Sequence, residues 1–317
     1  MTFRVLVTSR SFGSTSEVPL QILARAGCQI IKLPAGAKMD EASLIGAAGE
    51  VEGWIAGTEP ITARVIQASP HLKVIAKHGV GVDNIDLAVA RDRGIVVTNT
   101  PGANTEAVAE LTIGLMLALA RRIVRADRHL RAGSWKPIAG VELAGKTLGL
   151  IGLGRIARVV VRRLAGFEMN VIAYDPVRDE DFARQWRVRY CPLDDALRQA
   201  DFVSLHAPRT DATHGLIGAT QLALMKPTAF LINTARGELV DEPALIDALA
   251  AGRIAGAGLD VFACEPPGDS LLLTLENVTV TPHIGAHTAD AITVMSSMAA
   301  ESLVAALEGR PVPYPVV

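Results

Sequence analysis

Short runs of apolar, often β-branched residues alternate along the chain with stretches in which apolar residues recur at helical spacing. In the first hundred residues these runs predict strands at 3–8, 29–33, 53–56, 72–77 and 95–99, with a helix at 18–26. The runs are apolar throughout, which is typical of parallel strands that are covered on both faces. This part of the chain is therefore predicted to be a βα series.

A second series of the same kind follows a turn-rich stretch at 132–145. Its predicted strands lie at 147–151, 170–174, 202–206, 229–233, 256–261 and 278–281. One long helix is predicted before this series, at 104–132, and a last helix at 287–308 follows it without a seventh strand. The pattern indicates an α/β chain with two Rossmann-like, doubly wound domains.

Composition agrees with two such domains and limits the possible partners. The 317 residues are 50% hydrophobic and 20% charged, and the mean hydropathy is +0.31. These values exclude disordered and collagen-like proteins. The net charge of −2 provides no broad positive field for nucleic acid or an anionic membrane. We therefore expect a small-molecule partner.

The cysteines and the apolar runs favour a cytoplasmic location. Cys28, Cys191 and Cys264 are odd in number and lack metal-ligand spacing, so we expect a reducing compartment and no bound metal. The best apolar run, 111–120, is about half the ~20 residues that a membrane span requires. We expect neither a targeting segment nor a membrane anchor.

A basic stripe follows the predicted long helix. It consists of Arg121, Arg122, Arg125, Arg128 and Arg131. In a chain of nearly neutral total charge, such a stripe is more typical of a solvated or subunit-facing helix side than of an anion site. We assign it no function.

The sharpest local motif is a glycine-rich turn between a predicted strand and a predicted helix. Gly152 allows the tight turn, Gly154 lets the backbone approach a pyrophosphate at the helix N-terminus, and Ala157 stands where helix and strand pack closely. Asp175 ends the next strand, about 20 residues later, where a carboxylate binds the 2′-hydroxyl of a ribose and repels a 2′-phosphate. Arg178 would suit NADP instead, but Asp175 favours NAD.

Three segments at strand ends of the second series offer an arginine, a glutamate and a histidine. Hydride transfer at a C–OH or C=O carbon needs a proton donor and acceptor, and His283 suits this role because imidazole titrates near neutral pH. Glu265 is its expected partner, and Arg236 supplies a planar fork for a substrate carboxylate. His287 is a rival acid/base, although it is expected to begin the last helix.

In these motifs the sequence resembles the D-2-hydroxyacid dehydrogenase family, most closely its D-3-phosphoglycerate dehydrogenase branch. Besides the glycine turn, the resemblance rests on GVGVDNID at 79–86, NTPG at 99–102, AELT at 109–112, TARG at 234–237, LDVF at 259–262 and PHIG at 282–285. As an ordered set that spans essentially the whole chain, these motifs are highly specific.

The resemblance implies a discontinuous, flavodoxin-like substrate domain at 1–98 and 286–317 around a central NAD-binding Rossmann domain at 99–285. It also implies a homodimer built largely on the central domains, and a catalytic set of Arg236, Glu265 and His283. The chain ends at Val317 without the regulatory domain of many relatives, so we expect an unregulated, short-form enzyme.

Cofactor and substrate contacts are carried over from the family in the same way. Arg155 and Ile156 are expected at the pyrophosphate, and Thr234 and Asp260 along the nicotinamide half, with Asp260 on the carboxamide. The full set of expected NAD contacts is Gly152, Gly154, Arg155, Ile156, Asp175, Ala207, Pro208, Thr213, Thr234, Ala235, Arg236, Asp260, His283, Gly285 and Ala286. The expected substrate contacts are the backbone around His78, Gly79 and Val80, together with Arg236 and with Lys77 pointing at the site.

Two positions depart from the phosphoglycerate branch. Gly57 stands where its better-known members carry a substrate-facing arginine, and Lys77 replaces a second arginine. Lysine binds a phosphate as a point charge without bidentate geometry. The substrate therefore stays open between 3-phosphoglycerate and another 2-hydroxy acid, as in a glyoxylate or hydroxypyruvate reductase.

An interpretation from another class also stays open. Corepressors that sense NADH resemble this family and keep the same catalytic set. The chain has no long disordered tails for recruiting partners, which favours the enzyme. Turnover of a keto acid discriminates between the two.

Overall fold

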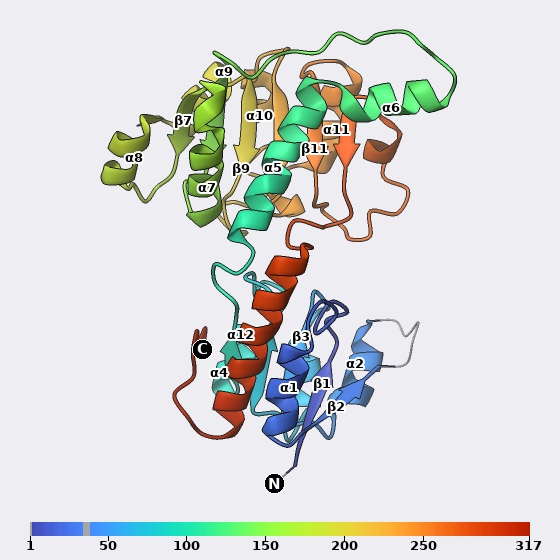
Figure 1. The fold of residues 1–317 in the computed structure, drawn as a ribbon, viewed down its shortest axis with the longest axis vertical. Coiled ribbons are helices and arrows are strands. Elements are labelled where there is room, and N and C mark those ends of the chain that lie inside the picture. Colours follow the sequence, from blue (N-terminus) through green and yellow to red (C-terminus); the bar gives the residue numbers. More distant parts are fainter. Residues whose placement is uncertain (1, 34–38) are drawn as a thin grey trace. The chain divides into compact units, whose positions relative to one another are not determined.

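The computed structural model describes residues 2–33 and 39–317, which divide into two compact units. The first unit contains Met1–Asn104 and Ala286–Val317, and the second contains Thr105–Gly285. Each unit is built on one wholly parallel sheet with helices on both faces (Figure 1). The α/β class predicted from the sequence is confirmed.

The first unit has a five-stranded sheet in the order β2-β1-β3-β4-β5. The strands are β1 (Phe3–Val7), β2 (Cys28–Lys32), β3 (Gly53–Ala56), β4 (Val74–Lys77) and β5 (Val96–Thr98). The five apolar runs of the sequence all form strands. Since β2 lies on one side of β1 and β3 on the other, the strand order reverses between β1 and β3.

Helices cover both faces of this sheet. They are α1 (Val18–Arg25), α2 (Glu41–Ala48), α3 (Ala63–Gln67), α4 (Leu87–Asp92) and α12 (Ala289–Leu307). Alternate residues of β3 enter different cores: Trp54 packs with residues of α2 and α3, whereas Ile55 packs with α1 and α12. Helix α12 is long and apolar enough to cross a membrane, but most of it is buried, as in a core helix of a globular protein.

The second unit has a seven-stranded sheet in the order β12-β11-β10-β9-β6-β7-β8. The strands are β6 (Thr147–Ile151), β7 (Asn170–Tyr174), β8 (Val188–Tyr190), β9 (Phe202–Leu205), β10 (Phe230–Asn233), β11 (Gly256–Leu259) and β12 (Val278–Val280). The order reverses between β6 and β9, which is where open α/β sheets bind ligands outside their carboxyl ends.

Helices also cover both faces of the second sheet. One core contains residues of α5 (Thr105–Ala120), α7 (Arg155–Leu164) and α8 (Glu180–Trp186). The other contains residues of α9 (Leu193–Gln199), α10 (Ala219–Leu224) and α11 (Glu242–Ala250). The glycine turn and the strand-end segments of the sequence therefore lie on a sheet that is buried on both faces.

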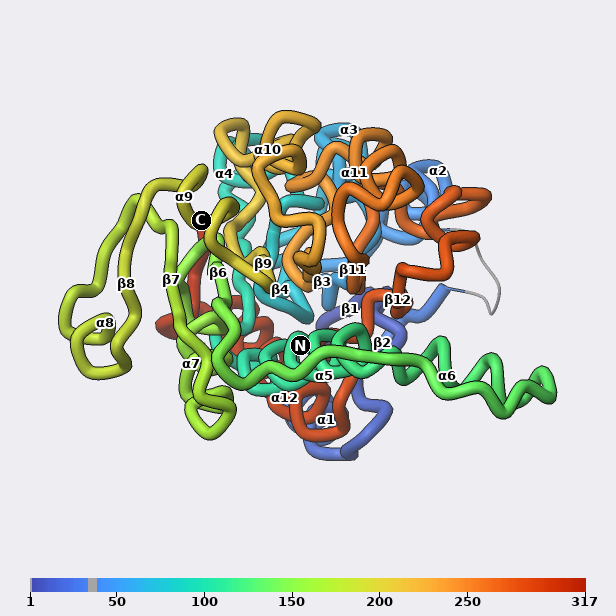
Figure 2. The backbone as a smooth tube through the Cα atoms, turned by 90° about the horizontal axis from the view of Figure 1, so that it is seen from above, coloured from blue at the N-terminus to red at the C-terminus, as the bar shows by residue number. Residues whose placement is uncertain are grey.

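Two predictions for the second unit are wrong. The sheet has a seventh strand, β8, which contains only three residues at the sheet edge. The predicted long helix is two helices, because Arg122 takes a left-handed conformation (φ 54°) between α5 and α6 (Ile123–Arg131). As a result, α6 runs away from the strands of its unit (Figure 2).

Candidate active site

The glycine turn joins β6 to α7. Gly152 has φ of +94°, and a Cβ atom there would lie 2.8 Å from the carbonyl carbon of His206, so only glycine fits. Gly154 is the N-cap residue of α7, where no side chain caps the helix, and the space around its Cβ position is open. The N-terminus of α7 can therefore take an anion on its backbone N–H groups. Arg155 and Ile156 are the first residues of this helix, and Ala157 is fully buried against the sheet.

Asp175 follows β7 and binds back to the glycine turn. Its Oδ2 accepts a hydrogen bond from the Leu153 N–H (2.7 Å), and its Oδ1 accepts one from the Val177 N–H (2.8 Å). Each carboxylate oxygen can accept a further bond, so the acid can also bind ribose hydroxyls. Arg178 packs over the Tyr190 ring, 5.2 Å from its centroid. The uncapped helix, the obligatory glycine and this carboxylate fit a dinucleotide whose ribose is not phosphorylated.

A second group of residues follows β10. Asn233 is buried, and its side chain fixes the turn: Oδ1 accepts from the Ala235 N–H (3.0 Å) and Nδ2 donates to the Arg236 carbonyl (2.8 Å). Arg236 Nη1 donates to the Ala235 carbonyl (2.8 Å). At Gly237, a Cβ atom would lie 1.9 Å from the carbonyl carbon of Phe262. The turn that carries Arg236 therefore packs directly on the backbone after β11.

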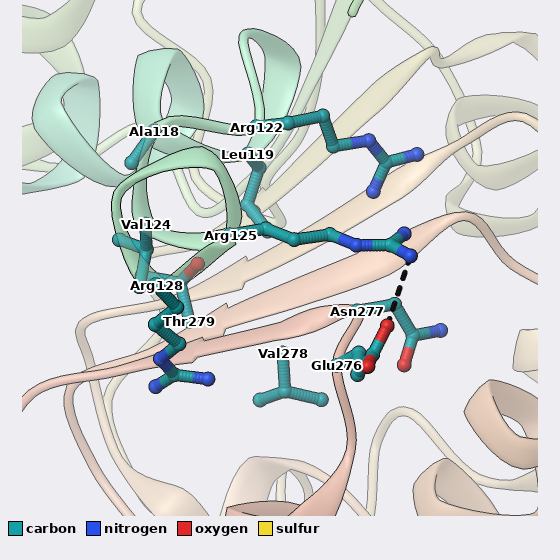
Figure 3. A pocket seen from close by; sticks show the side chains of 10 residues that line it. All are labelled: Ala118, Leu119, Arg122, Val124, Arg125, Arg128, Glu276, Asn277, Val278 and Thr279. Atoms are coloured by element: carbon teal, nitrogen blue, oxygen red, sulfur yellow. Dashed lines mark ion pairs between the residues drawn. The ribbon is translucent and has the colours of Figure 1, made fainter. Parts of the chain in front are cut away.

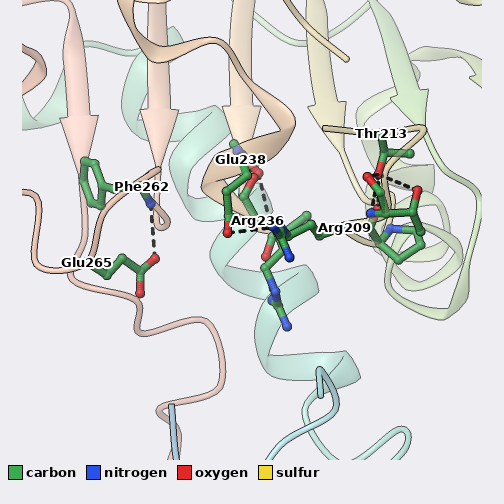
Figure 4. A network of polar contacts seen from close by, with 10 residues as sticks. Arg209, Thr213, Arg236, Glu238, Phe262 and Glu265 are labelled. Atoms are coloured by element: carbon green, nitrogen blue, oxygen red, sulfur yellow. Dashed lines mark hydrogen bonds and ion pairs between the residues drawn. The ribbon is translucent and has the colours of Figure 1, made fainter. Parts of the chain in front are cut away.

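That neighbouring segment carries Glu265, which contacts His283. The two carboxylate oxygens of Glu265 have different partners: Oε1 accepts from the Phe262 N–H (3.2 Å, Figure 4), and Oε2 lies 2.6 Å from His283 Nδ1. Partial burial by itself raises the pKa of Glu265. The hydrogen bonds and the charges of His283 and Arg236 outweigh this and hold the pKa below its usual range. Glu265 is therefore an anion that orients the imidazole through Nδ1.

The His283 loop is held by Asp260, which is buried at the end of β11. Its Oδ1 accepts from the Thr281 hydroxyl (2.6 Å) and the Ile284 N–H (2.8 Å), and its Oδ2 accepts from the Gly285 N–H (2.8 Å). The Asp260 carbonyl accepts the His283 N–H (2.9 Å), and His283 takes a positive φ of 51°. The carboxylate of Asp260 thus positions His283, and its expected contact with nicotinamide stays a prediction.

The other predicted cofactor residues of this unit lie at neighbouring strand ends. Thr234 is buried, with its hydroxyl 2.8 Å from that of Thr112 in α5. Ala207, Pro208 and Thr213 lie in the loop after β9, where the Thr213 hydroxyl donates to the Pro208 carbonyl (2.7 Å, Figure 4). This hydroxyl closes the loop.

Lys77 and His78 are buried at the end of β4 in the first unit. The Lys77 ammonium donates to the Gly57 carbonyl and to Asn84 Oδ1 (2.7 Å). The imidazole of His78 lies between two serine hydroxyls: Nδ1 is 3.0 Å from that of Ser9, and Nε2 is 2.9 Å from that of Ser296. Burial lowers the pKa of His78 to about 4, so the ring is neutral at pH 7.

After His78, the backbone rather than the side chains offers groups that can bind a ligand. Gly79 has φ of +153°, and its carbonyl accepts from the Thr100 N–H (3.0 Å), while the Val80 carbonyl accepts from Asn99 Nδ2 (2.8 Å). Within residues 2–33 and 39–317, the N–H groups of Gly79 and Val80 donate to no protein acceptor. Two adjacent N–H groups of this kind suit a carboxylate.

Two arginines of α6 and Arg122, which precedes this helix, make structural contacts, of which Figure 3 shows the ion pair of Arg125. Arg125 pairs with Glu276 (2.9 Å), Arg131 pairs with Asp127 (2.9 Å), and Arg122 lies over the Phe230 ring, 5.4 Å from its centroid. The cavity beside Arg125 has a volume of only about 10 Å³. That is room for a single water molecule.

Sequence reasoning gave no role to three residues that shape these sites. Asn233 orders the Arg236 turn, and Arg158 joins the glycine turn to α8 through the Leu153 carbonyl (3.0 Å) and Asp179 (2.6 Å). Glu59, buried after β3, binds the Gly57 N–H (3.0 Å). For Asn233 and Glu59 the available signal is an amide or acid at or just after the end of an apolar strand, whereas nothing of this kind marks Arg158.

Known proteins resemble this chain over most of its length. The sequence profile of the D-isomer specific 2-hydroxyacid dehydrogenase NAD binding domain matches residues 113–285. A glyoxylate reductase from Korarchaeum cryptofilum is 48% identical over 260 residues, which cover 80% of this chain and 78% of the relative. A D-3-phosphoglycerate dehydrogenase from Archaeoglobus fulgidus is 48% identical over 255 residues, which cover 80% of this chain but only 48% of the relative.

The fold is shared with solved structures. The TT0316 protein of Thermus thermophilus superposes with a TM-score of 0.90 at 41% identity, covering 99% of this chain and all of that one. The family and the NAD-binding Rossmann unit expected from the sequence motifs are confirmed. The chain belongs to the D-isomer-specific 2-hydroxyacid dehydrogenase family, a family of NAD-binding enzymes that act on hydroxy acids.

Proposed function

We propose that this chain interconverts a D-2-hydroxy acid and the corresponding 2-keto acid, with Arg236, Glu265 and His283 as its catalytic set. The observation that carries the proposal is the 2.6 Å contact between His283 Nδ1 and Glu265 Oε2. This pair lies at the carboxyl ends of the sheet whose glycine turn fits NAD.

His283 is the acid/base of the proposal. Because Nδ1 is held by Glu265, Nε2 is the ring nitrogen that exchanges a proton with the substrate oxygen. The anionic Glu265 stabilises the imidazolium form and fixes the ring orientation. NAD, when bound, supplies the hydride acceptor for the alcohol and, in reduced form, the donor for the keto acid. His287 precedes Thr288, which caps α12, and no carboxylate is paired with it in the described residues.

Substrate binding is assigned to backbone and arginine. The N–H groups of Gly79 and Val80 receive the substrate carboxylate, and Arg236 adds a planar, charged fork that also polarises the carbonyl. The side chains of Lys77 and His78 are held by their own unit, so at these positions the backbone makes the contact. In this proposal the substrate domain, expected from the sequence at 1–98 and 286–317, corresponds to the first unit, Met1–Asn104 and Ala286–Val317.

The NAD-binding domain of the proposal, expected from the sequence at 99–285, corresponds to the second unit, Thr105–Gly285. Gly152, Gly154, Arg155 and Ile156 bind the pyrophosphate at the N-terminus of α7, and Asp175 binds the adenosine ribose. The nicotinamide half is assigned to the remaining strand-end residues. These are Ala207, Pro208, Thr213, Thr234, Ala235, Arg236, Asp260, His283, Gly285 and Ala286.

Oligomeric state and location belong to the same proposal. Helix α6 and the segment after it expose large apolar side chains: Ile123 and Leu130 are each 54% exposed, and Trp135 is 87% exposed. Such a surface on the central unit supports a homodimer, which light scattering after gel filtration tests. The three unpaired cysteines support a cytoplasmic enzyme.

The substrate is proposed from the relatives' chemistry. They are named for glyoxylate and for 3-phosphoglycerate, so the reaction is hydride transfer at C2 of a small acid, with or without a phosphate. The test is NADH oxidation with glyoxylate, hydroxypyruvate, pyruvate, 2-oxoglutarate, oxaloacetate and 3-phosphohydroxypyruvate, with NADPH as the control. Turnover of at least one keto acid supports the proposal. Tight NADH binding with no turnover across the panel overturns it and favours an NADH-sensing, corepressor-like protein.

A further inference from the structure

The strand order of the first sheet marks one position for a ligand. The order β2-β1-β3-β4-β5 reverses between β1 and β3, and ligands of such sheets bind outside the carboxyl ends of the strands at the reversal. Thr8 and Ser9 follow β1, and Gly57 and Glu59 follow β3. The chemistry of these four residues therefore bears on what a ligand at this end of the sheet would meet.

A buried carboxylate already occupies this position. Glu59 is 6% exposed, and both of its carboxylate oxygens accept the Gly57 N–H, at 3.0 and 3.1 Å. The Thr8 hydroxyl also donates to Glu59, and it accepts a hydrogen bond from Trp54 Nε1–H (2.8 Å), which fixes its direction. The backbone donor of Gly57 is thus satisfied by an anion of the protein itself.

Gly57 leaves room for this arrangement. A Cβ atom at position 57 would lie 2.9 Å from Glu59 Oε2 and 3.2 Å from the Cα of Ser9. A larger residue with a cationic head would have to displace the Glu59 carboxylate. A side chain at position 57 and the present position of the Glu59 carboxylate therefore depend on each other.

The positive charge of the nearby Lys77 is matched by Glu59, so none is left over for a ligand. Lys77 donates to the carbonyl of Gly57 and to Asn84 Oδ1, so Lys77 and Glu59 hold the two polar groups of the same residue. Their formal charges cancel. His78 adds none, because its pKa is about 4. The buried groups at this end of the sheet thus present no net positive charge to a phosphate.

We propose that Glu59 is a specificity residue that rejects substrates with a second anionic group and selects 2-keto acids whose C3 substituent is uncharged. This inference rests on the proposed function and narrows its substrate class. The physical reason is that a carboxylate shielded from water repels a phosphate or second carboxylate strongly, whereas it accepts a hydrogen bond from a hydroxyl. Hydroxypyruvate satisfies this rule and glyoxylate, which has no C3, is not excluded by it, whereas 3-phosphohydroxypyruvate and oxaloacetate do not satisfy it.

Hydroxypyruvate and 3-phosphohydroxypyruvate are the decisive pair, because they differ only in the phosphate. We expect the wild-type enzyme to have a kcat/KM at least ~10-fold higher for hydroxypyruvate. In Glu59→Gln, which keeps the shape and removes the charge, that ratio should fall by at least ~10-fold. The control is Glu52→Gln at the opposite end of the same sheet, where Glu52 accepts the Arg4 N–H (2.8 Å); its ratio should equal that of the wild type.

A binding measurement supplements the rates. Thermal stabilisation of the NAD-saturated enzyme by D-glycerate should exceed that by 3-phosphoglycerate in the wild type, and the difference should shrink in Glu59→Gln. If Glu59→Gln does not fold, a wild-type preference for 3-phosphohydroxypyruvate still overturns the inference.

The results that would refute the role of Glu59 differ from those that would refute the dehydrogenase activity. Wild-type preference for 3-phosphohydroxypyruvate, or an unchanged ratio in folded Glu59→Gln, overturns the role of Glu59 and leaves the dehydrogenase in place. The exposed Arg10 after β1 is then the candidate phosphate partner, and loss of the preference in Arg10→Ala identifies it. No turnover of any keto acid removes the proposed function and this inference together.

Discussion

Replacing Gly237 with alanine tests the geometry that joins the Arg236 turn to the Glu265 loop. The new Cβ would lie 1.9 Å from the Phe262 carbonyl carbon, whereas ordinary contacts begin at 3.4 Å, so the two backbones must separate by about 1.5 Å (3.4 − 1.9). Because the Phe262 N–H binds Glu265, this separation moves Glu265 relative to Arg236. A displacement of ~1 Å in an active site costs about 100-fold, so we expect kcat/KM to fall by about that factor or more.

The stability change is expected to be modest by comparison. Overpacking of this kind costs about 1–3 kcal/mol, or several degrees in the melting temperature measured by circular dichroism. Gly114→Ala is the matched control, because Gly114 lies inside α5 with no atom within 4 Å of its Cβ position. It should retain activity and gain about 0.5–1 kcal/mol. If Gly237→Ala keeps more than half of the wild-type activity and melting temperature, the close approach of the two backbones is refuted.

The remaining predictions concern His283, Asp175 and His78. His283→Asn should lower turnover by at least ~100-fold and leave the NADH affinity in fluorescence titrations unchanged; unchanged turnover would transfer the acid/base role elsewhere. Asp175→Ala should raise NADPH binding relative to NADH by at least ~10-fold, because the carboxylate that repels a 2′-phosphate is lost; equal ratios would contradict its ribose contact. The pKa of His78 is about 4 when folded and 6.5 when unfolded, so the unfolded chain binds the proton more tightly and stability is lost as pH falls from about 6.5 to 4. Urea unfolding gives the free energy of unfolding at pH 7 and at pH 5. Between these values it should fall by about 2 kcal/mol less in His78→Asn than in the wild type, and equal decreases would contradict this.

The central strands were predictable because they are buried on both faces. Parallel strands such as β3 and β10 are continuous apolar runs, so hydrophobicity alone locates them. The sequence pattern did not predict the edge strand β8, because this strand has only three residues and one of them is the exposed Arg189. Local pattern also could not show the break between α5 and α6, since neither glycine nor proline marks it and Arg122 itself takes the left-handed conformation.

The two parts of the candidate site differ in how far the sequence could describe them. Arg236, Glu265 and His283 follow strands of one sheet, so parallel topology by itself brings them to one edge, and residue type then indicates their chemistry. Lys77 ends a strand and His78 follows it. Even so, Ser9, Gly57 and Ser296 determine what their side chains do. Those partners lie 69, 20 and 218 residues away in sequence, where no spacing rule applies.

The same difference explains why Gly57 is informative only with the structure. From the sequence, a glycine at this position is a missing cation, which leaves a phosphate without its partner. In the structure it is the position that lets Glu59 fold back onto the Gly57 N–H, so a missing positive charge becomes an added negative one. The first interpretation predicts weaker binding of a phosphorylated acid, and the second predicts its rejection. The change of the kcat/KM ratio in Glu59→Gln separates the two, because removing a carboxylate affects the ratio only if that carboxylate acts on the substrate.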